Sequence, residues 1–200
     1  MAKDFTELPP ELPVPQDDGA ADHLVGTAVP AVRLPSTLGG ELDLAAAAAG
    51  GDRVVVYVYP RTGRPGEPLP EGWDAIPGAR GCTPQSCAFR DHAGELAALG
   101  ASVIGLSAQS PADQAEFAAR ERIRYPVLSD EELVLERVMG LPTFETSGMR
   151  LYRRLTFVAH EGRIEKVFYP VFPPDRNAAD VLAWLERATG RPSAGTAPRR

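Results

Sequence analysis

Residues 53–59 (Arg-Val-Val-Val-Tyr-Val-Tyr) are the feature that most limits the fold of this chain. After the arginine, every residue in this run is β-branched or aromatic, a pattern typical of a central strand buried on both faces. A second run of this kind covers Ala101–Ser107. Between the two lies a helix candidate at 83–99, which Gly100 ends. Two buried strands joined through a helix predict a parallel pair inside an α/β sheet.

The remaining segments continue the alternation of strands and helices. Ser110 and Pro111 predict a helix start, with the helix running to about residue 122. Further elements are expected as a strand at 125–129, a helix at 131–138, a hairpin of strands at 155–159 and 164–169, and a helix at 177–189. An N-terminal hairpin is expected at 31–34 and 41–44. The predicted fold is α/β and thioredoxin-like, with a mixed central sheet flanked by helices.

Three stretches have an irregular composition. Residues 1–22 contain four prolines among acidic and small residues and predict a flexible arm. Residues 190–200 predict a disordered tail. A loop rich in proline and glycine precedes the first cysteine, and its segment 64–80 is interpreted as an insertion. The domain itself is expected to span residues 23–189.

Charge and hydropathy exclude several classes of function. The chain has 21 Lys and Arg against 27 Asp and Glu, a net charge of -6, and lacks the basic block that would follow a phosphate backbone. Nucleic-acid binding is therefore not expected. The longest strongly apolar run is too short to cross a membrane, and the first residues do not resemble a signal peptide. We expect a cytoplasmic protein, where a lasting structural disulfide is unusual.

The only two cysteines, Cys82 and Cys87, lie where a loop enters a helix. Cys82 falls at the expected cap or first turn, with Pro84 just inside, where its missing N–H does no harm. Free backbone N–H groups and the positive end of the helix dipole favour an anion at this point. A thiolate is such an anion, and it is the species that attacks a peroxide oxygen to give a sulfenic acid.

The five-residue separation of the two cysteines has a structural consequence. In an unbroken α-helix it places their Cα atoms roughly 8.7 Å apart, whereas a disulfide requires less than about 7 Å. The sulfurs can therefore join only if the start of the helix unwinds. Either cysteine could instead be a small buried apolar residue. A zinc site would need four ligands, and the three histidines are widely scattered.

The segment Gly81-Cys82-Thr83, followed by Cys87 and then Phe89-Arg90-Asp91, resembles the active-site segment of peroxiredoxins. Within that family it is most similar to the bacterioferritin-comigratory or Q-type branch. The resemblance covers roughly residues 23–188 and includes further blocks at 26–30, 59–60, 125–130 and 154–158.

This resemblance implies an atypical two-cysteine thiol peroxidase that reduces hydrogen peroxide and organic hydroperoxides. Cys82 would be the peroxidatic residue and Cys87 would resolve it within the same chain. Arg154 would hold the thiolate and polarise the peroxide, and Pro60 would shield the thiolate from water. Recycling by thioredoxin or a similar dithiol donor is implied, with no metal, haem or flavin cofactor. A monomer is favoured and a dimer is compatible with the branch.

The sequence departs from the family pattern at one position in this segment. The family carries Thr or Ser three residues before the peroxidatic cysteine, and Ala79 stands there. Thr62 is a candidate for the missing hydroxyl if its loop folds back, and Thr83 is a second one. Each has a plain alternative, as a loop residue or a helix cap. Trp73 in the inserted loop is either a lid over the pocket or a residue that packs the loop onto the core.

Two other functions use a pair of cysteines. A thiol–disulfide oxidoreductase exchanges thiols with proteins, but such enzymes use Cys-x-x-Cys, and the longer spacing argues against it. A redox sensor would be oxidised stoichiometrically, and a partner would recognise the opened helix. Catalytic turnover of peroxide with a thiol donor separates the peroxidase from the sensor.

Overall fold

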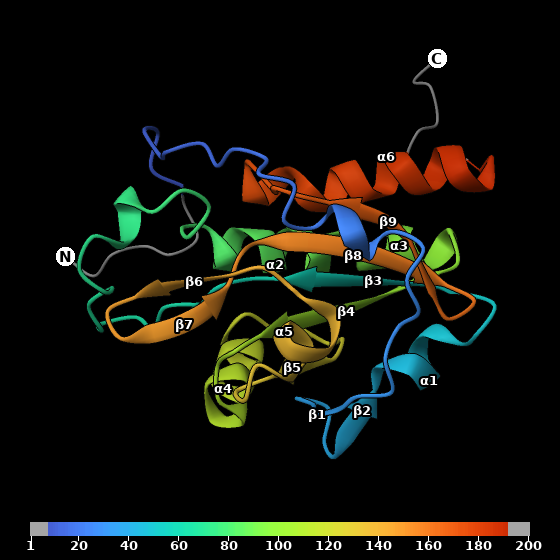
Figure 1. Ribbon diagram of the computed structural model, residues 1–200, viewed down its shortest axis with the longest axis horizontal. Helices are drawn as coiled ribbons and strands as arrows, with labels where there is room; N and C mark the ends of the chain where they lie inside the picture. The colour runs from blue at the N-terminus through green and yellow to red at the C-terminus, as the bar shows by residue number, and fades with distance from the viewer. Residues whose placement is uncertain (1–7, 192–200) are drawn as a thin grey trace.

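The computed structural model describes residues 8–191 and is built on a five-stranded mixed sheet (Figure 1). The order across the sheet is β5-β4-β3-β8-β9, with β3, β4 and β5 parallel and β8 and β9 antiparallel to their neighbours. The strands are β3 (Arg53–Val58), β4 (Ala101–Ser107), β5 (Val127–Ser129), β8 (Leu155–His160) and β9 (Arg163–Phe168). The predicted mixed sheet with residues 53–59 at its centre is thus confirmed.

Side chains of β3 alternate between two apolar layers, because successive residues of a strand point to opposite faces. Val54, Val56 and Val58 belong to one layer, and Val55 and Tyr57 to the other. Helices α1 (Leu44–Ala48) and α5 (Val134–Met139) contribute to the first layer. The second layer is shared by α2 (Cys82–Asp91), α3 (Ala93–Ala98), α4 (Pro111–Arg120) and α6 (Asn177–Thr189). Helices therefore cover both faces of the sheet, as Figure 1 shows for α6 and α5.

Two helices differ from their predicted bounds. The single helix expected at 83–99 is interrupted at His92, which leaves the helical conformation (φ -94°, ψ 3°) just before Gly94. Glycine has low helix propensity, so a break costs little there. Helix α5 begins three residues later than expected, because the Asp130 carboxylate accepts a hydrogen bond from the Val134 backbone N–H at 2.8 Å.

Two small hairpins lie beside the central sheet. The predicted N-terminal one is confirmed as β1 (Arg33–Pro35) paired antiparallel with β2 (Glu41–Asp43). The other, β6 (Thr143–Thr146) with β7 (Met149–Tyr152), was not predicted. Its turn residues Ser147 and Gly148 both have positive φ, which suits a two-residue turn between strands. Three short 3-10 helices complete the described elements: η1 (Asp22–Leu24), η2 (Trp73–Ala75) and η3 (Pro174–Arg176).

The part of the predicted flexible arm that the structure describes, residues 8–22, has defined contacts with the rest of the chain. The Asp18 carboxylate accepts a hydrogen bond from the Tyr169 hydroxyl at 2.8 Å and lies 3.5 Å from the Arg153 guanidinium. Pro15 and Val14 line a cavity described below. Of the predicted tail, residues 192–200 lie outside the described part of the chain.

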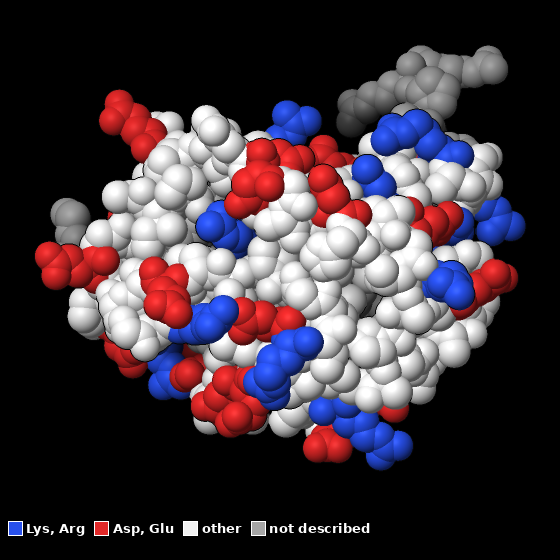
Figure 2. Space-filling model, in the orientation of Figure 1, with Lys and Arg blue, Asp and Glu red and all other residues white. Residues whose placement is uncertain are grey.

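The surface seen in Figure 2 carries acidic and basic side chains interspersed with uncharged ones, without a continuous basic patch on that face. Among the helices within residues 8–191, none combines the length and apolar character needed to cross a membrane.

Candidate active site

The backbone at Gly81 positions the first cysteine. Gly81 is the N-cap of α2 and adopts a left-handed conformation (φ 98°), so Cys82 is the first residue of the helix, as predicted. A Cβ at Gly81 would lie 2.3 Å from Cγ of Pro174 in η3 and 2.7 Å from Cδ2 of Leu8. Both the conformation and the close packing require glycine. The Cys82 side chain is 3% exposed and is a free thiol.

Arg154 lies against the Cys82 sulfur. Its Nη2 is 3.1 Å from Sγ and also donates to the carbonyl oxygens of Ala79 (3.2 Å) and Arg80 (3.1 Å). Its Nε donates to the carbonyl of Gly78 at 3.1 Å. The residue is 3% exposed, so its guanidinium is not a surface group in contact with solvent. The guanidinium both contacts the sulfur and fixes the loop that leads into α2.

A cavity of about 10 Å³ lies at Cys82, room for roughly one water-sized group. Thr62 lines it, as do Arg80, Thr83 and Trp73. The Thr62 hydroxyl donates to Gln109 Oε1 at 3.0 Å, and the Thr62 backbone N–H donates to the same oxygen at 2.7 Å. The loop therefore folds back as the missing-hydroxyl hypothesis requires, with the oxygen of Thr62 able to accept a further hydrogen bond.

Pro60 and Arg154 line a second cavity of about 500 Å³. Neither Pro60 nor Arg154 lines the small cavity at Cys82. The structure therefore places the predicted residues around two spaces, with Thr62 at the small cavity and Pro60 and Arg154 at the larger one. The larger cavity is walled mainly by apolar side chains from the N-terminal segment, the inserted loop, β6 and the chain after β9: Val14, Pro15, Ile76, Pro77, Phe144, Pro170 and Val171.

Trp73 is almost fully buried and packs against Ala79 and Leu151. It therefore packs the inserted loop onto the body of the protein, one of the two expected roles, and it also borders the cavity at Cys82. Ala79 contributes its carbonyl oxygen, which lies 3.6 Å from the Cys82 sulfur and accepts from Arg154.

Cys87 lies in the same continuous helix as Cys82. Its side chain is half-buried and is a free thiol. Its Sγ donates to Glu121 Oε2 at 3.6 Å. Burial raises the pKa of the Cys87 thiol to about 11; the carboxylates of Glu121 and Asp91 act in the same direction and Arg90 opposes them. Because both cysteines are on one intact helix, their Cα atoms are about 8.7 Å apart, and a disulfide requires α2 to open.

A buried polar network holds α2 closed. Gln85, one turn after Cys82, accepts from Arg154 Nη1 and donates through Nε2 to Asn177 Oδ1 at 2.9 Å. The Asn177 oxygen also accepts from the Thr156 hydroxyl at 2.6 Å. Unwinding of α2 at Gln85 would break its contacts with both partners, so the network stabilises the helical form.

The comparison with known proteins identifies the family. The Redoxin family model matches residues 24–182. Peroxiredoxin Bcp of Escherichia coli strain K12 is 32% identical over 165 residues, which cover 80% of this chain and 94% of that protein. The chain is a peroxiredoxin.

Further comparisons agree with this assignment. The chloroplastic peroxiredoxin Q of Gentiana triflora is 31% identical over 138 residues, 69% of this chain. Those residues correspond to 56% of the gentian protein, so this chain matches little more than half of that relative. The crystal structure of peroxidoxin BcpB from Mycobacterium tuberculosis superposes with a TM-score of 0.65 at 29% identity, covering 82% of this chain and 96% of that one.

Three residues of this peroxiredoxin site were not predicted from the sequence: Gln85, Asn177 and Glu121. Only Gln85 carried a usable signal, since its spacing of three from Cys82 places both on one helix face. Asn177 and Glu121 reach α2 through tertiary packing alone. Among residues 8–191, no three His, Cys, Asp or Glu side chains lie together as metal ligands.

Proposed function

We propose that this peroxiredoxin is a thiol-dependent peroxidase that reduces hydrogen peroxide and organic hydroperoxides. The observation that carries the proposal is the contact of 3.1 Å between Arg154 Nη2 and Cys82 Sγ. A guanidinium keeps its charge at all relevant pH values, so it stabilises the thiolate. It is also placed to stabilise the negative charge that develops on the leaving oxygen.

The proposed catalytic cycle has three chemical steps. The Cys82 thiolate attacks one peroxide oxygen, the O–O bond breaks, and the other oxygen leaves as alcohol or water after taking up a proton. Helix α2 then opens, and Cys87 attacks the sulfenic sulfur of Cys82. An S–S bond forms, the S–O bond breaks, and water leaves. A dithiol donor such as thioredoxin returns both cysteines to thiols.

The larger cavity supports organic hydroperoxides as substrates. It has about 500 Å³, is lined mainly by apolar side chains, and reaches Arg154 and Pro60. An alkyl group could occupy it with the peroxide near the guanidinium. We propose that Pro60 is a wall of this cavity that limits the access of water, and that Thr62, which lines the small cavity at Cys82, accepts a hydrogen bond from the peroxide. We further propose a cytoplasmic monomer.

The competing function is exchange of thiols with protein partners. Both cysteines lie on one intact helix, and the Cys82 sulfur is almost fully buried. A buried sulfur admits a small peroxide more readily than the disulfide of a protein. This observation favours the peroxidase.

The assignment is tested by one-equivalent oxidation. Reduced protein is mixed with one equivalent of hydrogen peroxide, tryptophan fluorescence gives the rate, and mass spectrometry gives the product. We expect a Cys82–Cys87 disulfide in the unmodified chain, no reaction in Cys82→Ser, and a sulfenic acid that persists in Cys87→Ser. Oxidation no faster than that of a free thiol would contradict the peroxidase and favour thiol exchange.

The opening of α2 is tested by amide hydrogen exchange. Formation of the disulfide is expected to raise the exchange rates of the amides of residues 85–87 by more than about tenfold, because local opening removes their helical hydrogen bonds, the first of which joins the Gln85 N–H to the Gly81 carbonyl. Amides of β4 serve as the internal control and should not change. Equal protection of α2 in the reduced and the oxidised protein would contradict local opening.

A further inference from the structure

Glu121 is the acidic side chain nearest to the resolving cysteine. It follows α4 directly, and its carboxylate, with a side-chain exposure of 12%, lies between two partners. One oxygen accepts from Arg120 Nη1, and the other is 3.6 Å from Cys87 Sγ. The Glu121 backbone carbonyl also accepts from Arg90 Nη1 at 2.7 Å, which ties this position to α2 a second time.

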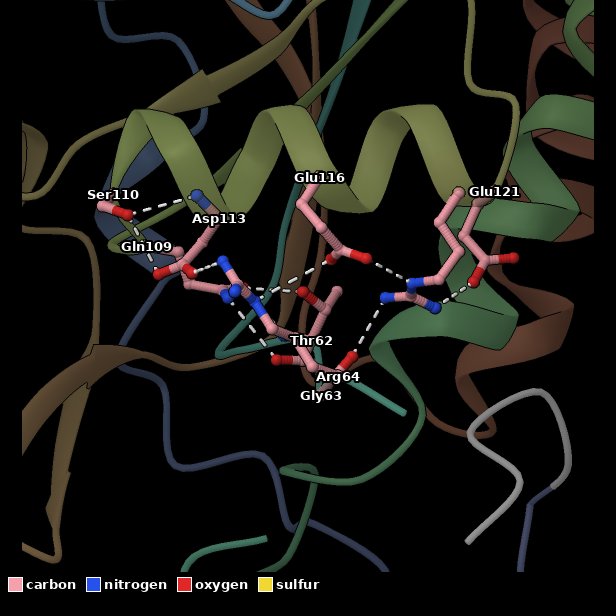
Figure 3. Close-up of polar contacts among 9 residues, drawn as sticks. Thr62, Gly63, Arg64, Gln109, Ser110, Asp113, Glu116 and Glu121 are labelled. Atoms are coloured by element: carbon pink, nitrogen blue, oxygen red, sulfur yellow. Dashed lines mark hydrogen bonds and ion pairs between the residues drawn. The ribbon is translucent and has the colours of Figure 1, made fainter. Parts of the chain in front are cut away.

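Arg120 fixes the direction of the Glu121 carboxylate. Besides Glu121, the Arg120 guanidinium donates through Nε to Glu116 Oε1 at 2.8 Å and through Nη2 to the Gly63 carbonyl at 3.0 Å. Figure 3 shows Glu116 and Glu121 projecting from one side of α4 toward the loop of Thr62 and Gly63. The carboxylate is thus held against Cys87 by the same loop that lines the cavity at Cys82.

Charged and titratable side chains from several elements surround the Cys87 thiol. Burial is the main cause of the raised pKa, and the anionic form is disfavoured further by Glu121 and Asp91 and favoured by Arg90. The hydroxyls of Tyr57 and Tyr125 also face this thiol, and a charge on Cys87 contributes to their own raised pKa. Glu121 is the only one of these groups within the described residues that accepts a hydrogen bond from the sulfur.

We propose that Glu121 is a positioning residue that keeps Cys87 as a protonated, hydrogen-bonded thiol while α2 is helical, so that the resolving nucleophile is released only when the helix opens. The proposal rests on the proposed two-cysteine peroxidase for its role in the cycle. Before opening, a thiol hydrogen-bonded to a carboxylate is a poor nucleophile and resists oxidation by peroxide itself. After opening, Cys87 leaves the carboxylate and regains ordinary thiol reactivity.

The direction of the pH dependence follows from the raised pKa. The folded-state pKa of Cys87 is about 11, above its ordinary value of 9.0. The closed helix, which buries the neutral thiol beside Glu121, therefore has its full stability below the ordinary pKa of Cys87, and it loses this stability as the pH rises through the folded-state pKa. Disulfide formation from the sulfenic acid should accelerate through this pH interval. The Cys87 thiolate is repelled by the Glu121 carboxylate, and this repulsion favours the open helix.

The test measures Cys87 alone. In the Cys82→Ser background, iodoacetamide alkylation of Cys87 is followed from about pH 8 to about pH 11, with folding checked by circular dichroism. The nearly isosteric Glu121→Gln change is expected to lower the midpoint and to raise the alkylation rate near pH 8 by about three- to tenfold, since tenfold corresponds to one pKa unit. Glu116→Gln is the matched control: it removes the same charge from the other carboxylate that pairs with Arg120, whereas the Cys87 sulfur donates its hydrogen bond to Glu121.

A second measurement tests whether Glu121 controls the rate of disulfide formation. With both cysteines present, Glu121→Gln should speed the step from sulfenic acid to disulfide by a similar factor, whereas Glu116→Gln should match the unmodified protein. Equal alkylation profiles for the two Gln variants would overturn the proposal, and so would a shifted profile without a faster resolving step. Failure of Cys82 to react with peroxide would instead contradict the peroxidase assignment. The alkylation profile of Cys87 would still report whether Glu121 keeps this thiol protonated.

Discussion

Replacing Arg154 with methionine is expected to slow the oxidation of Cys82 by hydrogen peroxide by about 100- to 1,000-fold, the effect of removing one preorganised donor from a site of developing charge. The Arg154 guanidinium lies 3.1 Å from the Cys82 sulfur in a buried position. Burial keeps water from replacing it, and methionine retains the unbranched apolar stem of the side chain without the guanidinium and its charge. The second-order rate constant is measured by stopped-flow fluorescence.

Two matched variants separate charge from shape in this experiment. Arg154→Lys keeps the charge but loses the planar guanidinium and its several N–H donors. Its rate should therefore lie between that of Arg154→Met and that of the unmodified protein. Arg153→Met removes a charge one residue away; Arg153 is exposed and bonds to the Thr143 carbonyl, so the rate should stay near that of the unmodified protein. A loss below about tenfold in Arg154→Met would mean that electrostatic stabilisation by this residue is not the main source of reactivity.

Arg154 also has a structural role that the experiment must take into account. Three loop carbonyls, those of Gly78, Ala79 and Arg80, accept hydrogen bonds from it. A buried acceptor that loses its donor destabilises a protein by about 1 to 3 kcal/mol. Urea unfolding of Arg154→Met should show a loss of this order, and rates are to be compared where the variant is fully folded.

The elements that the sequence predicted well are those with a complete local signal. Residues 53–59 and Ala101–Ser107 form buried strands because β-branched and aromatic runs have few alternatives. The start of α4 follows from Ser110 and Pro111, and the Ser110 side chain caps the helix by accepting from the Asp113 N–H. The end of the helix expected at 83–99 is confirmed before Gly100, but its break at His92 was not predicted, because neither His92 nor Gly94 by itself ends a helix.

The candidate site was predictable only in part, for a related reason. Cys82 and Cys87 stand in one short segment, and the family resemblance singled out Arg154, 72 residues beyond Cys82. Gln85 and Asn177 are 92 residues apart, and their contact follows from the docking of α6 on α2. Nothing in either local sequence indicates that pairing. The same holds for Glu121, whose partner Cys87 lies 34 residues earlier.

Replacing Gly81 with alanine is expected to lower the free energy of unfolding by about 2 to 5 kcal/mol, combining backbone strain with overpacking. Gly81 has φ 98°, and an added Cβ would lie 2.3 Å from the rigid ring of Pro174 and 2.7 Å from Leu8. Since η3 packs closely on α2, relief of the clash must move the first turn of α2. That movement draws the Cys82 sulfur away from Arg154, so oxidation by peroxide should slow as well.

Gly94→Ala is the matched control for this substitution. Gly94 lies in α3, its φ is not positive, and nothing is within 4 Å of the position of an added Cβ. Alanine should therefore stabilise the protein by about 0.5 to 1 kcal/mol. Urea unfolding and the rate of Cys82 oxidation are measured for both variants. If Gly81→Ala matches the unmodified protein in both, then the left-handed cap is not what holds Cys82 against Arg154, and the hydrogen bonds of Arg154 to the loop carbonyls must position the sulfur on their own.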